Sequence, residues 1–255
     1  MYESAAESAS RSPALKVSAV SVRFGGLSAL QDVDLDAEAG EVTGLIGPNG
    51  AGKTTLFNVV TGLLEPTNGK VYLGDREITR RRAHQRARMG MARTFQRLEV
   101  FGSLSARDNI MVAAESRRSW ARETSDPSTV SDEILERVGL QDVADRRVDA
   151  MPTGMARLVE LGRALATRPS LLLLDEPGSG LDERETDTFG QLLLALAEDG
   201  LAVVLVEHDV GLVMRVCQRI FVLDFGQMIA VGSPADIQGN RAVQAAYLGD
   251  EDISA

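Results

Sequence analysis

The sequence is poor in cysteine, with Cys217 as the only one among 255 residues. A single thiol excludes an intrachain disulfide, and nothing else points to an oxidising compartment. Free cysteines are usually buried, and Val213, Val216 and Ile220 surround this one at helical spacing. We therefore expect Cys217 to be a core thiol on a helix.

The sequence also lacks a long apolar run. No stretch approaches the roughly 20 residues that a membrane helix needs. Residues 1–12 are rich in Ser, Ala and Glu and contain no apolar segment typical of a signal peptide. We expect residues 1–13 to form a disordered tail, residues 250–255 an acidic tail, and the protein to be cytosolic, reaching a membrane only through a partner.

Basic residues are in deficit, with 27 Lys and Arg against 37 Asp and Glu, for a formal net charge of -10. A nucleic-acid binder usually carries a basic face, so this balance argues against that class of partner. It leaves room for a local basic groove that holds phosphates. The 44% hydrophobic and 25% charged content is ordinary for a globular protein. The length suits one large domain, or a domain with one insert, and allows a core without cross-links.

The apolar patterns predict an α/β fold. Residues 15–24 and 30–35 alternate as strands do, and a further strand is expected at 70–73 after an Asn68-Gly69 turn. Residues 41–46 predict a short apolar strand. Two further segments are continuously apolar, as in parallel strands buried on both faces: residues 171–174 and 202–206. An amphipathic helix at 183–198 lies between the last two, which makes a strand–helix–strand unit.

The middle of the chain, about 98–165, predicts a helical subdomain inserted into this core. Helices are expected at 104–114 and 131–138, separated by a charged, Ser-rich surface loop at 115–130 with a turn at Asp126-Pro127. Towards the end, residues 224–227 predict a hairpin turn and residues 242–248 a closing helix.

A glycine-rich segment follows the strand at 41–46 and opens a helix at 53–63. It reads Gly47-Pro48-Asn49-Gly50-Ala51-Gly52-Lys53-Thr54-Thr55 and fits the phosphate-loop pattern G-x-x-x-x-G-K-[ST]. Its glycines let backbone N–H groups converge on phosphates, and the helix N-terminus adds positive potential. Lys53 would contact the β- and γ-phosphates and Thr54 would ligate Mg²⁺. The alternative is a glycine-rich turn with an incidental lysine.

A pair of acids ends the strand at 171–174. Asp175 at the end of a buried strand is placed to hold Mg²⁺, and Glu176 to accept a proton from an attacking water. The alternative is two acids that open a loop before Pro177. His208 follows the strand at 202–206, where ligand crevices form in α/β sheets, and would donate a hydrogen bond to a γ-phosphate. His84 is expected to be a solvated residue without a role.

In this order, the motifs resemble those of the ATPase subunits of ABC transporters. The resemblance spans about residues 14–249 and implies a P-loop NTPase core, of mixed and parallel strands flanked by helices, with an N-terminal antiparallel β subdomain. It implies that Phe24 stacks on adenine, that Gln96 is the Q-loop glutamine and joins Thr54 and Asp175 at Mg²⁺, and that His208 is the switch histidine. Residues 178–182, ending in Asp182, resemble the D-loop.

Within this family, the sequence is most similar to the ATPases of branched-chain amino acid importers. The similarity lies in the residues of four short stretches, and not in their spacing: 24–27, 93–104, 206–209 and 246–249. It implies two ATPase chains closed head to tail around ATP, each site completed by the other chain's signature motif. It also implies permease subunits docked near residues 96–104 at the cytoplasmic face of the membrane, and a solute-binding protein beyond them. Urea and amide importers share much of this pattern.

The signature motif departs from the family pattern. Where Leu-Ser-Gly-Gly-Gln is usual, this chain has Met151-Pro152-Thr153-Gly154-Met155. Pro152 has neither a hydroxyl nor a backbone N–H to offer a partner's γ-phosphate. The chain's own Lys53, Asp175, Glu176 and His208 are intact, which predicts a heterodimer with one strong and one weak ATP site. In the competing hypothesis, Thr153 supplies the missing hydroxyl and both sites work.

Three other functions stay open on sequence grounds. A lipid-export ATPase shares the same motifs, although Arg93-Thr94-Phe95-Gln96 favours import. A non-transport ABC ATPase that acts on the ribosome or on DNA usually carries two ATPase halves and handles nucleic acid. A regulatory ATP-binding protein without hydrolysis would not need Glu176 and His208.

Overall fold

The computed structural model describes residues 12–248, and its strands form two sheets. The predicted tails fall mainly outside this range. The larger sheet has six strands in the order β10-β9-β3-β8-β7-β6, parallel except for the β9–β10 hairpin. Its strands are β3 Val42–Ile46, β6 Met91–Arg93, β7 Leu171–Asp175, β8 Ala202–Val206, β9 Arg219–Asp224 and β10 Gln227–Gly232. The predicted α/β class and the hairpin are confirmed.

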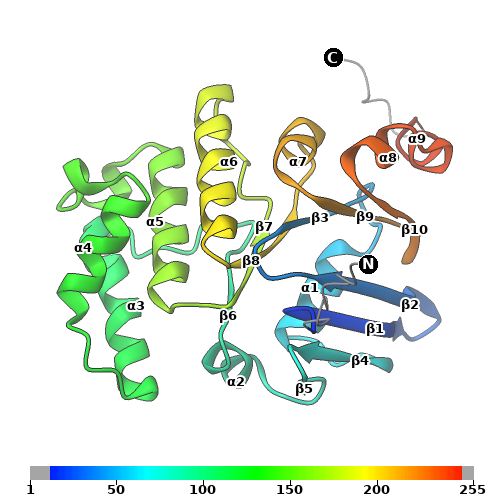
Figure 1. The fold of residues 1–255 in the computed structure, drawn as a ribbon, viewed down its shortest axis with the longest axis horizontal. Helices are drawn as coiled ribbons and strands as arrows, with labels where there is room; N and C mark the ends of the chain where they lie inside the picture. Colours follow the sequence, from blue (N-terminus) through cyan, green and yellow to red (C-terminus); the bar gives the residue numbers. More distant parts are fainter. Residues whose placement is uncertain (1–11, 249–255) are drawn as a thin grey trace, which may run out of the picture.

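The smaller sheet is antiparallel, in the order β2-β1-β4-β5 (Figure 1). Its strands are β1 Leu15–Phe24, β2 Leu27–Ala37, β4 Asn68–Leu73 and β5 Arg76–Glu77. The turn predicted at Asn68-Gly69 is wrong, because both residues belong to β4. Gly69 has φ +90°, and a Cβ there would lie 2.4 Å from the carbonyl oxygen of Ala19. The glycine therefore allows β4 to approach an irregular stretch of β1.

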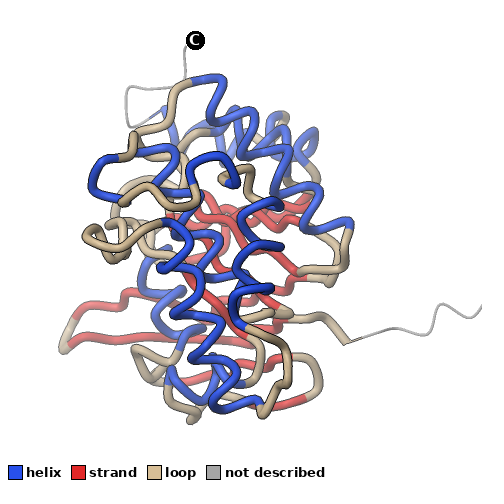
Figure 2. Tube along the Cα trace, turned by 90° about the vertical axis from the view of Figure 1, so that its left-hand side faces the viewer, coloured by secondary structure: helices blue, strands red, loops and turns tan. Residues whose placement is uncertain are grey.

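Helices cover both faces of the larger sheet. They are α1 Lys53–Thr61, α2 Ala83–Arg88, α3 Ala106–Ala121, α4 Pro127–Arg137, α5 Thr153–Ala166, α6 Glu183–Glu198, α7 Val210–Val216, α8 Pro234–Gln238 and α9 Arg241–Leu248. From the side of α3, α4 and α5, helices lie in front of the strands (Figure 2). None of the helices in residues 12–248 combines the length and the apolarity that a membrane crossing requires.

The loop predicted at residues 115–130 is too long, because only residues 122–126 lie outside the helices. Helix α3 continues to Ala121, and α4 starts at Pro127. The predicted turn is a helix start, because Asp126 accepts a hydrogen bond from the Thr129 backbone N–H and proline suits the first helical position. Charged residues here cover the outer side of a helix, since α3 buries Ile110 and Ala114 on its inner side.

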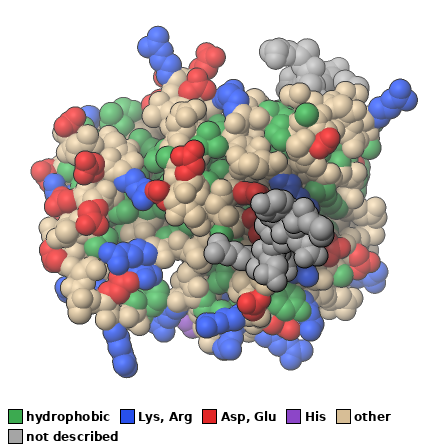
Figure 3. Space-filling model, in the orientation of Figure 1, with side chains coloured by type: hydrophobic (Ala, Val, Ile, Leu, Met, Phe, Trp, Pro, Cys, Tyr) green, Lys and Arg blue, Asp and Glu red, His purple; other side chains and the backbone are tan. Residues whose placement is uncertain are grey.

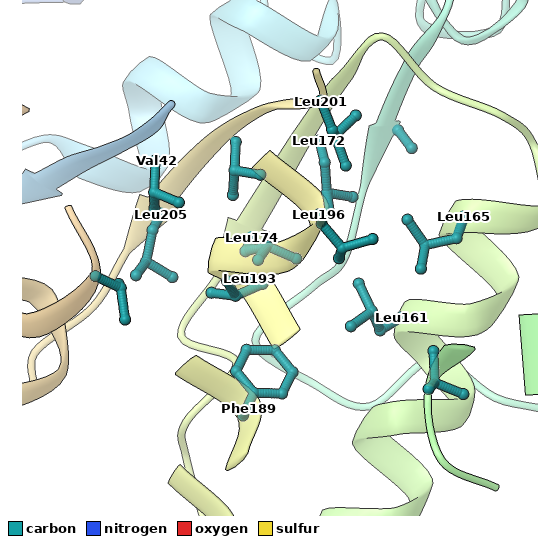
Figure 4. Packing of buried hydrophobic residues seen from close by; sticks show 14 of the residues in the cluster. Val42, Leu161, Leu165, Leu172, Leu174, Phe189, Leu193, Leu196, Leu201 and Leu205 are labelled. Atoms are coloured by element: carbon teal, nitrogen blue, oxygen red, sulfur yellow. The ribbon is translucent and has the colours of Figure 1, made fainter. Parts of the chain in front are cut away.

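The alternate residues of the central strands supply two cores. Leu171 and Leu173 face α1 and the smaller sheet, whereas Leu172 and Leu174 face the opposite helices. On that second face, side chains from α5 and α6 pack against the strands in one cluster (Figure 4). The larger sheet therefore packs against α5 and α6 on one face, and against α1 and the smaller sheet on the other.

Cys217 is a core thiol, as predicted, but it caps the end of α7 and does not lie within the helix. Burial raises its pKa to about 12. The sequence prediction also missed β6, whose three residues pair with β7 in parallel. The strand matters for the site because it carries Arg93.

Candidate functional site

The phosphate loop joins β3 to α1 in a conformation that only glycine tolerates at its start. Gly47 has φ +154°, and a Cβ there would lie 1.9 Å from the carbonyl oxygen of Leu223. Gly52 caps α1 in the left-handed region, and the loop closes with a 3.1 Å hydrogen bond from Ala51 N–H to Pro48 O. The loop therefore directs its backbone N–H groups and the N-terminus of α1 at one space.

The Lys53 ammonium folds back over this loop. Its Nζ donates to Gly47 O at 2.5 Å and to Pro48 O at 3.1 Å. Burial lowers the pKa of Lys53, while the carboxylates of Glu176 and Asp175 act in the opposite direction. Both carboxylates are therefore close enough to Lys53 to act on its charge. Thr54, next in α1, is exposed.

Asp175 and Glu176 lie at the C-terminal end of β7 in different environments. The Asp175 side chain is 7% exposed and pairs with Arg93. Glu176 has φ +50°, a left-handed backbone that is unusual for a residue with a side chain, and its N–H donates to Val206 O at 2.8 Å. Strained residues of this kind cluster at functional sites. Five other non-glycine residues among those described also have a positive φ, but Glu176 alone of the six also follows the buried strand β7 directly.

Gln96 and His208 flank Glu176. The Gln96 side-chain amide donates to Glu176 Oε2 at 2.8 Å, and His208 Nδ1 lies 3.9 Å from the same oxygen. The His208 side chain is 66% exposed, and its Nδ1 also lies 3.6 Å from Glu207 Oε2. Residues from two other segments of the chain therefore lie beside the Glu176 carboxylate.

Glu207 is a site residue that sequence reasoning missed. Its carboxylate is buried and accepts from the Gly178 N–H at 2.6 Å and the His208 N–H at 3.1 Å. Burial raises the pKa of Glu207, and these hydrogen bonds only partly oppose the effect. The carboxylate ties the loop after β7 to the loop after β8. A signal was present, since an acid follows the buried strand β8 directly.

Phe24 ends β1 and is 51% exposed. It pairs with Leu27 across the tight β1–β2 hairpin. Two residues further on, the carbonyl oxygen of Ala29 would lie 2.9 Å from a Cβ placed on Gly52. The hairpin that carries Phe24 is therefore next to the phosphate loop, and its exposed ring is available for stacking.

The degenerate signature lies at the start of α5, in the helical group on the far side of β6 and β7 from α1 (Figure 1). Pro152 is the N-cap without a side-chain hydrogen bond, and Thr153 is exposed. Among residues 12–248, no hydrogen bond or ion pair joins positions 152–154 to the phosphate loop. These residues do not complete the chain's own phosphate site.

The signature packs instead against the loop at 178–182. A Cβ on Gly154 would lie 2.4 Å from Glu185 Oε1. Asp182 and Glu185 cap α6 reciprocally, with Asp182 Oδ1 accepting from the Glu185 N–H at 2.8 Å. Glycine at position 154 thus lets the starts of α5 and α6 approach closely, beside a pocket of about 270 Å³ lined by Met155, Leu158 and Phe189 among others.

Helix α5 is fastened to the segment that follows β6. Arg157 donates to the carbonyl oxygen of Gln96 at 2.7 Å and to that of Phe95 at 3.1 Å. Glu160, paired with Arg157 at 3.1 Å, accepts from the Glu99 N–H at 3.1 Å. The helix that begins with the signature therefore also holds the loop that presents Gln96.

The donor set fits a metal held mainly by a ligand's phosphates. The described residues, 12–248, contain no group of three His, Cys, Asp or Glu side chains that could hold a metal alone. Mg²⁺ commonly uses one or two carboxylates plus phosphates and waters. Asp175 supplies one such carboxylate at the end of β7. The Thr54 hydroxyl, at the start of α1, is a further oxygen ligand.

Residues 30–179 match the family model described as ABC transporter, and residues 227–253 match the one described as branched-chain amino acid ATP-binding cassette transporter. The chain is 38% identical over 251 residues to the high-affinity branched-chain amino acid transport ATP-binding protein BraF of Pseudomonas aeruginosa, covering 93% of this chain and 98% of BraF. It is 33% identical to the lipopolysaccharide export system ATP-binding protein LptB of Escherichia coli, covering 89% and 94%.

Solved structures give the same picture. A nucleotide-free ATP-binding cassette from an ABC transporter superposes with a TM-score of 0.84 at 27% identity, covering 93% of this chain and all of that chain. A dimeric cassette in a post-hydrolysis state, bound to ADP and phosphate, superposes with a TM-score of 0.75 at 26% identity, covering 86% and 98%.

Proposed function

Because this chain belongs to the ABC transporter ATP-binding family and is therefore an ATPase, we propose that it energises the import of branched-chain or related amino acids. The observation that carries the proposal is the double match, to the general cassette over 30–179 and to the branched-chain type over 227–253. The substrate itself would be selected by permease and solute-binding subunits, which this chain serves from the cytoplasmic face of the membrane.

In the proposed reaction, a water attacks the γ-phosphorus of ATP, the bond to the β,γ-bridging oxygen breaks, and Glu176 accepts the water's proton. Gln96 orients Glu176 through the hydrogen bond that its side-chain amide donates. His208 donates to a γ-phosphate oxygen. Lys53 and the backbone of residues 47–55 hold the phosphates, with Phe24 against the adenine. The 2.8 Å hydrogen bond from Gln96 to Glu176 supports the first role, and the position of His208 Nδ1, 3.9 Å from the same carboxylate oxygen, supports the second.

Three residues of this chain would hold Mg²⁺: Thr54, Asp175 and, through its side-chain oxygen, Gln96. Held there, the ion would offset the negative charge of the phosphates during hydrolysis. Gln96 donates to Glu176 in the present arrangement, so its oxygen remains free for this purpose.

We also propose that the chain works in a head-to-tail pair with a different ATPase. Helix α5, which positions 152–154 begin, lies on the other side of β6 and β7 from α1 (Figure 1), which supports a role of these positions towards a partner's ATP. A dimeric cassette is also among the similar structures. Since Pro152 offers no donor, the partner's site would be the weaker one and this chain's site the stronger. Thr153 is exposed and remains the alternative source of a hydroxyl.

The permease would dock on residues 96–104 and the groove beside them. Phe101 is 46% exposed within that segment, and Phe95, Leu63 and His84 line an apolar groove of about 270 Å³ next to α2. The exposed His84 therefore has a place on this proposed surface. On the face shown in Figure 3, acidic and basic side chains are interspersed without a continuous basic stripe.

Reconstitution tests the proposal. The chain is combined with its neighbouring ATPase, permease and solute-binding subunits in vesicles, and uptake of radiolabelled leucine is measured with ATP on the ATPase side. ATP-dependent uptake, abolished by Lys53→Ala, is expected. Outward movement of lipid instead would favour the export function, for which LptB is the relevant relative. Capture of ribosomes or DNA without any permease would favour a non-transport role.

A further inference from the structure

Arg93 and Asp175 form a buried ion pair at the edge of the phosphate site. Arg93 Nη2 lies 2.7 Å from Asp175 Oδ2, and each side chain is 7% exposed. The residues are 82 positions apart in sequence but end neighbouring parallel strands, β6 and β7. The guanidinium therefore reaches the carboxylate from the neighbouring strand of the same sheet.

The Arg93 side chain is held in place from three directions. Its Nη1 donates to Asn58 Oδ1 at 2.8 Å and to Thr61 Oγ1 at 3.3 Å, both on α1. The guanidinium carbon lies 5.5 Å from the centre of the Phe57 ring and 4.8 Å from that of Phe95. A planar cation fixed between two rings cannot follow a moving carboxylate, so it sets where that carboxylate lies.

A second buried arginine nearby has no carboxylate partner in the part of the chain that the structure describes. Arg86 is 1% exposed and donates to the carbonyl oxygens of Arg81, Val59, Val60 and Thr79. Burial lowers its pKa to about 10. Arg86 thus fastens the end of α1 as a structural group, and the contrast shows what is particular to Arg93: a bond to a single site carboxylate.

We propose that Arg93 is a positioning residue that orients the Asp175 carboxylate for Mg²⁺. The inference rests on the proposed function, in which Asp175 takes part in holding the metal. The guanidinium bonds Oδ2, and within residues 12–248 no hydrogen bond is made to Oδ1, so one oxygen is fixed and the other is available to the site. Groups that hydrogen-bond a metal-ligating carboxylate typically change metal affinity or activity by about 10- to 100-fold when they are removed.

Arg93 also connects the two acids to one loop. Gln96, three residues later, donates a hydrogen bond to Glu176, so residues 93–96 contact Asp175 at one end and Glu176 at the other. Arg157 of α5 donates hydrogen bonds to the carbonyl oxygens of Phe95 and Gln96 in the same stretch. A shift of α5 would therefore be transmitted to both carboxylates.

The test measures metal dependence through nucleotide binding by the full chain, without hydrolysis. Binding of a fluorescent ATP analogue is followed in EDTA and then at increasing free Mg²⁺. For Arg93→Lys, which keeps the charge but loses the planar fork, we expect the Mg²⁺ midpoint to rise about 10-fold or more, with unchanged binding in EDTA. Arg86→Lys is the matched control and is expected to lower the melting temperature without moving the midpoint.

Asn58→Ala serves as the second variant, because it frees one side of the guanidinium without removing the buried charge. It is expected to move the midpoint in the same direction by a smaller factor. Wild-type midpoints for both Arg93→Lys and Asn58→Ala would overturn the proposal, as would an unmoved Asn58→Ala if Arg93→Lys does not fold. Asp175→Asn tests the metal role of Asp175 separately from the positioning role of Arg93. If this variant responds to Mg²⁺ as the wild type does, Asp175 does not hold the metal.

Discussion

Gln96 links the acid of the site to the helix that begins with the signature. Its side-chain amide donates to Glu176 Oε2 at 2.8 Å, while its own carbonyl oxygen accepts from Arg157 of α5 at 2.7 Å. Positions 152–154 at the start of α5 are directed towards a partner in our proposal. If ATP at the partner's site moves α5, the position of Gln96 in this chain would change. The position of the Glu176 carboxylate, which Gln96 bonds, would change with it.

Glu176→Gln should abolish most ATP turnover in the assembled complex. A glutamine keeps the shape but cannot accept the proton, and loss of a general base costs about 10²- to 10⁴-fold. ATP binding should persist, which equilibrium binding would show alongside steady-state phosphate release. The matched control is the equivalent change in the partner ATPase, with a smaller expected loss. If Glu176→Gln leaves most turnover intact, the asymmetric model is wrong.

Pro152→Ser should strengthen the partner's site. In a complex whose own site is blocked by Glu176→Gln, the new hydroxyl would add a donor to the partner's γ-phosphate, and single donors of this kind contribute about 10²- to 10³-fold. Serine at this N-cap should also stabilise α5 by about 1 kcal/mol. Single-turnover hydrolysis gives the measurement.

Pro152→Ala is the control for that gain, because it removes the ring without adding a hydroxyl. An equal gain from alanine would show that the hydroxyl is not responsible. Thr153→Val addresses the alternative directly: a large loss of turnover at the partner's site would mean that Thr153 already supplies the donor.

Phe24→Ala should weaken ATP binding by about 1–3 kcal/mol, the usual range for loss of a base–aromatic stack. Tryptophan at this position should retain affinity. Because the ring is 51% exposed, the melting temperature should change little. Phe101→Ala, which removes a similarly exposed ring at 46% from the proposed permease surface, should leave nucleotide binding unchanged. Equal affinities for wild type and Phe24→Ala would remove Phe24 from the site.

Glu207 should make stability depend on pH. Its pKa in the folded state is raised by burial, so the folded protein binds this proton more tightly than the unfolded chain. The contribution of Glu207 to the free energy of unfolding is therefore greatest below the unfolded pKa and falls as the pH rises through the folded value. Urea unfolding of wild type and Glu207→Gln from acidic to neutral pH should show their difference changing with that sign. A difference independent of pH would contradict it.

Local patterns predicted those elements whose own residues decide their structure. The helix at 183–198 and the strand at 202–206 were predicted with the bounds that the structure has. A capping acid, an amphipathic repeat and a continuous apolar run specify them without reference to the rest of the chain. The error at 115–130 has the opposite cause. There a polar helix is stabilised by its inner face packed on α5, and composition alone suggested a loop.

The sequence by itself determined the phosphate loop, the acids at 175 and 176 and the family to which they belong, because strand, loop and helix follow one another within a few residues. Only the tertiary structure decided what surrounds those acids. Arg93 reaches Asp175 because β6 and β7 pair in parallel, and Glu207 joins two loops because β7 and β8 end side by side. These contacts depend on strand order, which no local pattern specifies.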